Sequence, residues 1–363
     1  MKRLSIVLVS ITALAGPCAG AFAQTVQIPP DAISAPSLTD GHRNAIRAFI
    51  DEHKKGLSGD AAELRRDRTS LAQPLLGPNV SVQFRQEYAR TLGPVLQPML
   101  AASEHEAINA LNLAGELATP AMLQLLAQSL GDTRVSVRYA SLVGYRATFD
   151  AVSRSAPAIA PEPLLGEVRS LAAAMLKEDN PQALDGFVLA LGAASRVPEG
   201  QVAGLRSAAL GALVRGVAAK AADAPGASLD NSRVLALLRG GQIVRDALTD
   251  PGRKPPAPEL QKEIGGMAGD LLAHVARRLK AVPSGEELEA PTRTLLAQLT
   301  AVAEADFFFA ASALGGQPGQ TSLSKDVSAG RDPSFLKNVE TVIGGNGAAT
   351  KPPFGFQAGR FKF

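Results

Sequence analysis

Apolar residues recur at spacings of three and four along most of the chain, which is the period of an α-helix. Ile46, Phe49 and Ile50 share one such face near the start of this pattern. Between residues 104 and 311, segments rich in Ala and Leu alternate with short breaks of Pro, Gly, Asp and Asn. Nothing in that region alternates like a β-strand. The pattern therefore predicts an all-α chain of successive packed helices.

The two ends of this helical region have a different composition. Residues 24–40 hold several prolines and little periodicity, which predicts an exposed linker. After Leu314 the chain turns to Gly, Ser, Pro, Gln and Asn, and only residues 333–343 are long enough for a short helix. We expect a helical domain over 41–312. The low-complexity tail, 313–363, should bury too little apolar surface to order itself alone.

The first residues, MKRLSIVLVSITALAG, place two basic side chains before an apolar run at 4–15. Small residues follow at Ala21 and Ala23, the two positions that a signal peptidase recognises. This order predicts a secretory signal peptide over residues 1–23, cut after Ala23. The mature protein should then be periplasmic or secreted.

A lipid anchor is the alternative for this segment. Cys18, the only cysteine in the sequence, follows a box of small residues, as in lipid-anchored bacterial proteins. Pro17 directly before it departs from that pattern. Cleavage after Ala23 removes Cys18, so the mature chain would have no disulfide and would depend on its apolar core for stability.

Composition and charge narrow the expected partners. Hydrophobic residues make up 46% of the chain but aromatic residues only 4%, so Ala, Leu and Val must build the core. The formal charge is +3, and removal of Lys2 and Arg3 leaves 35 basic residues against 34 acidic ones. Without a dense basic run, nucleic acid is not an expected partner. No later apolar run approaches about 20 continuous residues, so we expect no integral membrane segment in the mature chain.

Two breaks between helical segments are similar to each other. Leu130-Gly131-Asp132 leads to Val137 and Arg138, and Asp179 lies in a comparable turn 47 residues after Asp132. A period of this length is typical of HEAT-type helical repeats. A weaker copy begins about 30 residues before the first.

At these residues the chain resembles the HEAT-repeat family, in which a turn Asp is followed six residues later by Arg in a Val-Arg pair. The resemblance implies a right-handed α-solenoid of HEAT-like helix pairs. It also implies a ladder of charge-assisted hydrogen bonds between Arg138 and the turn aspartates Asp132 and Asp179, with Val137 packed inward. Asp185 stands where the second copy should have Arg, so a continuous ladder is in question.

The resemblance covers only part of the chain. It is good over residues 119–149, fair to about residue 195, and limited to general Ala and Leu helical character beyond. An irregular helical bundle is the main alternative architecture.

No set of residues in the sequence has the spacing of a metal or catalytic site. The four histidines are not in paired-ligand positions, and the side chains of Glu104, His105 and Glu106 diverge on a helix. Two Ser-x-x-Lys matches, beginning at Ser322 and Ser334, lie in the Ser-rich tail without the other elements of penicillin-binding enzymes. We expect no metal and no cofactor.

These observations predict a non-catalytic exported helical-repeat protein that is a protein-binding or scaffolding surface in the cell envelope. Its partner would be an envelope protein. The alternative is a helical hydrolase or lyase acting on envelope polymers. A structural subunit of an envelope complex is a third possibility.

The end of the tail, FGFQAGRFKF, spaces its phenylalanines in two pairs. One interpretation is an extension whose rings pack back on the helical domain, since exposed rings favour aggregation. The other is a mobile, weakly basic docking segment that inserts its rings into an envelope partner. The candidate docking residues are Phe354, Phe356, Phe361 and Phe363.

Overall fold

The computed structural model describes residues 26–223, 230–283, 286–317, 319 and 321–363. The predicted signal peptide, Cys18 included, lies outside the described residues. Every regular element in the described part is a helix, and no strand occurs there. The prediction of an all-α fold is confirmed.

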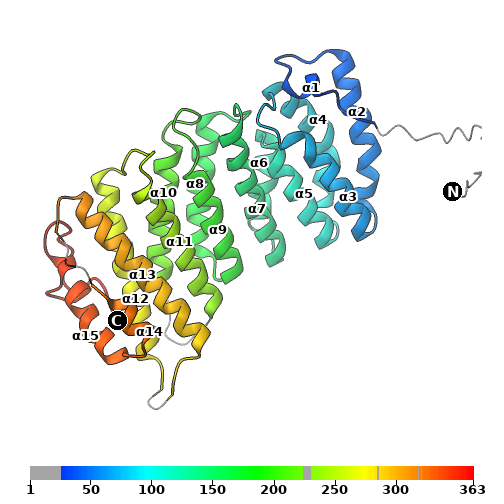
Figure 1. The fold of residues 1–363 in the computed structure, drawn as a ribbon. Helices are drawn as coiled ribbons and strands as arrows, with labels where there is room; N and C mark the ends of the chain where they lie inside the picture. The colour runs from blue at the N-terminus through cyan, green and yellow to red at the C-terminus, as the bar shows by residue number, and fades with distance from the viewer. Residues whose placement is uncertain (1–25, 224–229, 284–285, 318, 320) are drawn as a thin grey trace, which may run out of the picture.

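The helices follow one another with short connections (Figure 1). The α-helices are α1 (Pro30–Ser34), α2 (Asp40–His53), α3 (Ala61–Ala72), α4 (Val82–Met99), α5 (Glu104–Leu117), α6 (Pro120–Ser129), α7 (Val135–Arg154), α8 (Pro161–Lys177), α9 (Pro181–Ala194), α10 (Leu205–Ala222), α11 (Asn231–Thr249), α12 (Pro258–Lys280), α13 (Ala290–Ala313), α14 (Leu323–Ser328) and α15 (Asp332–Ile343). Three short 3₁₀ helices are η1 (Lys54–Ser58), η2 (Gln73–Leu75) and η3 (Ala348–Thr350).

Local sequence explains where several helices begin. The Asp60 carboxylate accepts hydrogen bonds from two backbone amides in the first turn of α3. Ser103 and Glu106 form a reciprocal capping box at the start of α5. The Asn180 side chain caps α9 in the same way that Asp60 caps α3. These caps satisfy amides that have no partner inside the helix.

The helices pack in two rows because each helix contacts the helix two positions further along the chain. Helices α3, α5, α7, α9, α11 and α13 contact in that order and form what we call the odd row. Helices α8, α10 and α12 contact in the same way in the even row, which α4 and α6 begin. Figure 1 shows the pairs side by side in chain order, from the N-terminal to the C-terminal end.

Small residues let neighbouring helices approach closely. A Cβ on Gly115 of α5 would lie 2.4 Å from the carbonyl oxygen of Gly144 in α7, so the two backbones are in direct contact. A Cβ on Gly192 of α9 would lie 2.6 Å from the side chain of Ile243 in α11. The core around these contacts is mainly Ala, Leu and Val, as the composition predicts.

The N-terminal segment differs from the expected exposed linker. Residues 30–34 form α1, and the side chains of Ala32 and Leu38 are buried. The Ser81 amide donates to the carbonyl of Ile33 at 2.9 Å, which ties the segment to the start of α4. The described part of this segment therefore belongs to the helical body.

The tail, which was not expected to order itself alone, is ordered against the helical body. It forms α14 and α15, of which only α15 matches the predicted short helix. Helix α14 contacts α13, and α15 contacts α12. The ordering depends on these contacts with the helical body, which a local count of apolar residues does not include.

One helix among the described residues, α13, is long and apolar enough to cross a membrane by length and composition alone. Isolated Thr, Gln, Glu and Asp side chains interrupt its apolar run, so it is not a continuous apolar stretch in the sequence. Helix α13 packs against α11, α12 and α14, and most of its apolar side chains are buried there. This packing is that of a core helix.

Candidate functional site

The predicted repeat residues meet at the beginnings of α7 and α9. Arg138 donates from Nε to Glu178 Oε2 at 2.9 Å and from Nη2 to Glu178 Oε1 at 3.1 Å. Its Nη1 donates to the backbone carbonyl of Asp132 at 2.9 Å. Arg138 therefore connects two successive turns by a bidentate ion pair and a backbone contact.

The acidic partners in this connection differ from those that the resemblance implied. The Asp132 carboxylate accepts from Arg134 at 2.8 and 3.0 Å, and this guanidinium lowers the pKa of Asp132 below its usual value. The Asp179 side chain is 91% exposed and lies 3.7 Å from the ammonium of Lys220. Glu178, one residue earlier, occupies the position expected for Asp179. Val137 is buried, as predicted.

Asp185, which replaces the expected second Arg, also pairs with a neighbouring unit. Its Oδ2 forms an ion pair with Arg239 of α11, while its buried Oδ1 has no hydrogen-bond partner among the described residues. A charged contact therefore links α9 to α11, with the acid and the base exchanged relative to the contact made by Arg138.

An apolar cavity of about 560 Å³ lies beside these residues, across the N-terminal parts of α5, α7, α9 and α11. Tyr139, Ala140 and Val143 of α7 line it together with Ile108 of α5 and Leu235 of α11. Val143 is 36% exposed, which is unusual for a large aliphatic side chain in this chain. The remaining lining residues are Asn112, Ser136, Pro181, Gln182, Asp185 and Ser232.

A second cavity, of about 600 Å³, adjoins the first between α3 and α5. Ile108 lines both cavities. The other lining residues are mostly polar: Ser58, Gly59, Ala61, Leu64, Arg65, Arg68, Ser103, His105, Glu106 and Asn109. We call the two cavities together the odd-row groove, which crosses α3, α5, α7, α9 and α11.

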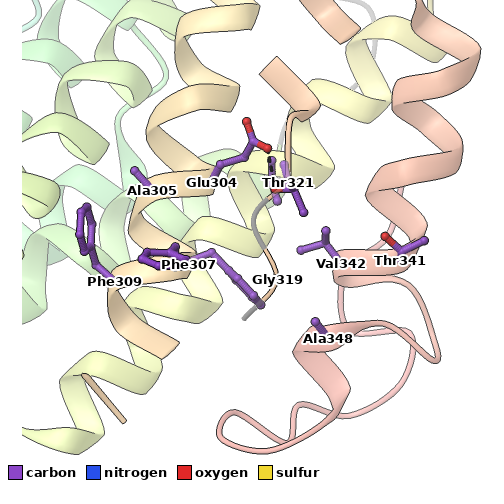
Figure 2. Close-up of a pocket in the computed structure, with 11 residues that line it drawn as sticks. Glu304, Ala305, Phe307, Phe309, Gly319, Thr321, Thr341, Val342 and Ala348 are labelled. Atoms are coloured by element: carbon purple, nitrogen blue, oxygen red, sulfur yellow. Dashed lines mark hydrogen bonds between the residues drawn. The ribbon is translucent and has the colours of Figure 1, made fainter. Parts of the chain in front are cut away.

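A third cavity, of about 420 Å³, lies between α13 and the tail (Figure 2). Phe307 and Phe309 of α13 line one side, and Val342 of α15 with Ala348 lines the other. The Glu304 carboxylate in its wall accepts from the Thr321 hydroxyl at 2.6 Å and from the Leu323 amide at 2.7 Å. Because Glu304 holds the start of α14, this cavity is part of the contact between the tail and the body.

The four phenylalanines near the C-terminal end lie against α12. The rings of Phe354 and Phe361 are buried. A Cβ on Gly265 would lie 2.1 Å from the Phe354 ring, and a Cβ on Gly269 would lie 2.4 Å from the Phe361 ring. Phe356 and Phe363 are partly buried. The guanidinium of Arg360 lies 3.2 Å from the Asp270 carboxylate and stacks 4.6 Å from the Phe356 ring. The rings pack back on the helical domain, which was one of the two interpretations, and docking to a partner would require them to leave α12.

Three buried titratable groups in α12 and α13 have shifted pKa values. Burial raises the pKa of Asp270 to about 6 despite the nearby Arg360. Burial, together with the neighbouring Arg277 and Arg278, lowers the pKa of His274 to about 4. Asp306 is completely buried, neither carboxylate oxygen has a hydrogen-bond partner within the described chain, and burial raises its pKa well above the usual value.

These groups do not converge on either cavity of the odd-row groove. Asp306 lies against Gly241 of α11 inside the core, and Asp270 is covered by Arg360. Among the described residues, no group of three or more His, Cys, Asp or Glu side chains is placed to bind a metal ion.

Sequence reasoning found the repeat residues but missed the groove beside them. Tyr139 and Val143 belong to the helix that Arg138 begins, and their exposure depends on the positions of α5 and α9. Asp185 was noticed only as a departure from the motif. No protein-family model matches the chain, and no curated protein matches its sequence.

Proposed function

We propose that this chain is an exported, non-catalytic helical-repeat protein that binds a protein partner of the cell envelope along the odd-row groove. The observation that carries the proposal is the groove itself, in which two adjoining cavities cross five neighbouring helices of the odd row. Stacked helix pairs provide long surfaces of this kind for extended partners.

The proposed architecture is a right-handed α-solenoid of HEAT-like helix pairs. Successive odd-row helices contact one another from α5 to α13, whereas α6 and α8 of the even row scarcely touch. A row whose members lie closer together forms the inner side of a curved array. This difference supports a concave odd row, and the contact between Arg138 and Glu178 supports a repeated turn.

The proposed export depends on the N-terminal sequence and on the absence of cysteine after Cys18. A helical hydrolase or lyase acting on envelope polymers is the alternative. The groove favours binding over catalysis because the ion pair at its apolar cavity, between Asp185 and Arg239, joins α9 to α11.

A groove-blocking variant tests the proposal. Val143→Arg places a long cation in the apolar cavity, and Leu176→Arg makes the same change on α8, where Leu176 is 51% exposed outside the groove. Tagged wild type and both variants are crosslinked in the native envelope and purified. We expect the wild type and Leu176→Arg to recover the same partner and Val143→Arg to lose it.

Equal recovery by all three proteins would reject the groove as the binding surface. Breakdown of an envelope polymer by the purified wild type would instead support the enzyme alternative. Circular dichroism of both variants must match the wild type, so that lost recovery reports on the groove.

A further inference from the structure

The two cavities of the odd-row groove differ in chemistry. Arg65 and Arg68 line the cavity between α3 and α5, and neither side chain has an acidic partner within the described ranges. Asp67, which lies between them in sequence, is instead bound by His53 and Arg66. The cavity between α3 and α5 therefore presents two cations that nothing in the described structure neutralises by direct contact.

The carboxylate that lines this cavity, that of Glu106, already accepts hydrogen bonds within its own helix start. Glu106 Oε2 accepts from the Ser103 hydroxyl at 2.6 Å and from the Ser103 amide at 3.1 Å, as part of the capping box of α5. Glu104, in the same turn, accepts from the Ser136 hydroxyl of α7. These neutral donors hold both acids at the helix starts without removing their charge. The lining of the cavity still has two arginines against one carboxylate, which leaves an excess of positive charge for an external anion.

The adjoining cavity is suited to an apolar side chain. The side chains of Ile108, Tyr139, Val143 and Leu235 line it. Its Asp185 carboxylate is paired with Arg239, which reduces its effect on a charged ligand. Asn112 and Gln182 at its edge add amide groups of the kind that pair with an extended peptide backbone.

We propose that the odd-row groove binds an extended peptide segment that has acidic residues at one end and an aliphatic or aromatic residue further along. The acidic side chains contact Arg65 and Arg68, and the apolar side chain enters the cavity over Val143. This inference rests on the proposed function, because it names the partner chemistry of the same groove.

Helix spacing sets the distance between the two parts of such a peptide. The basic cavity lies between α3 and α5, and the apolar cavity is centred near α7 and α9. Adjacent helices lie about 8–10 Å apart, so the centres are separated by two spacings, about 16–20 Å. An extended chain rises about 3.3 Å per residue, which places the apolar residue about five or six positions from the acidic ones.

A peptide fits this surface better than a nucleic acid does. The apolar cavity contains one aromatic ring, that of Tyr139, among aliphatic side chains, whereas single-stranded nucleic acids need successive aromatic platforms. The cations occur only at one end of the groove, so a phosphate backbone crossing the whole groove would not be matched along its length.

The test is selection from a phage-displayed library of random 12-residue peptides on the immobilised full chain. Wild type is compared with Arg65→Glu/Arg68→Glu, with Val143→Arg, and with the control Arg169→Glu on α8, where Arg169 is exposed. We expect wild type and the control to enrich peptides with acidic residues five or six positions from an apolar residue. Charge reversal should replace the acidic residues by basic ones, and Val143→Arg should abolish enrichment.

Synthetic peptides from the selection should bind wild type at least tenfold more tightly than the charge-reversed variant at low salt, and less so at high salt. Enrichment that depends on Val143 but shows no acidic preference would overturn this inference and leave the proposed function intact. If no protein, the wild type included, enriches any peptide, both this inference and the proposed binding of peptide segments by the groove are overturned. Equal enrichment by wild type and Arg65→Glu/Arg68→Glu would show that the two cations do not select the partner.

Discussion

Substitution of Gly265 by Ala tests the packing of the C-terminal segment on α12. The added Cβ would lie 2.1 Å from Cε1, 2.5 Å from Cζ and 2.8 Å from Cδ1 of Phe354. Carbon atoms in good contact are about 3.5–4.0 Å apart, so the ring must move by more than 1 Å or leave its site. The exposed fraction of Phe354 is only 1%, so little free space is available for this movement.

The expected cost is set by two opposing effects. Overpacking in a core costs about 1–3 kcal/mol, and loss of the ring contact altogether is bounded by the roughly 3–5 kcal/mol of a Phe→Ala change. The Ala side chain returns about 1 kcal/mol through its higher helix propensity. The net cost is then about 0–2 kcal/mol for overpacking and at most about 2–4 kcal/mol if the ring leaves its site, so we expect Gly265→Ala to lower the free energy of unfolding by about 1–3 kcal/mol.

Urea denaturation followed by circular dichroism measures this loss, and α8 offers a matched control. A Cβ on Gly166 would meet no atom within 4 Å, so Gly166→Ala should raise stability by up to about 1 kcal/mol. Gly265→Ala combined with Phe354→Ala should cost less than the two single changes together, because the clash is removed with the ring. If Gly265→Ala behaves like Gly166→Ala, Phe354 does not pack against Gly265 in solution.

Three further predictions concern buried or partly buried charges. Arg138→Ala should lower the free energy of unfolding by about 1–3 kcal/mol because it leaves Glu178 unpaired, and a double-mutant cycle with Glu178→Gln that shows no coupling would reject the contact. His274 stays neutral in the fold down to a pKa of about 4, while the unfolded residue takes a proton below about pH 6.5. The wild type should therefore lose about 3 kcal/mol between pH 6.5 and 4 through this residue, and His274→Gln should not; parallel pH profiles of unfolding would contradict this. Asp306→Ala removes a buried carboxyl without hydrogen-bond partners in the described structure and should raise stability by about 1–3 kcal/mol at neutral pH. The raised pKa of Asp306 makes the wild type less stable as pH rises above about 4, so the stabilisation by Asp306→Ala should be larger at pH 8 than at pH 5. A difference in denaturation midpoints that stays constant with pH would contradict this prediction.

Local sequence was sufficient to predict the helices but not every packing contact. The spacing of apolar residues and the breaks at Pro, Gly and Asp gave the all-α class, and Val137 was correctly expected in the core. Phe354 and Phe361 pack against Gly265 and Gly269, about 90 residues earlier in the chain. A contact between such distant residues has no local signal in one sequence.

The candidate site was predicted only in part for a similar reason. The turn motif identified Arg138 as a link between units, but its partner is Glu178 because that side chain reaches the guanidinium while Asp179 points to solvent. The odd-row groove takes residues from five helices, and each contributes only a few side chains. Its cavities become visible only when the helices are placed next to one another.

The proposed binding surface is tested most directly by site-specific photo-crosslinking in the native envelope. A photoreactive amino acid is placed in turn at Ile108, Tyr139 and Val143 in the groove and at Leu176 on the even row. We predict that the three groove positions give an adduct with the same protein and that Leu176 gives none. Adducts from Leu176 alone, or the same adducts from all four positions, would contradict the assignment of the odd-row groove as the binding surface.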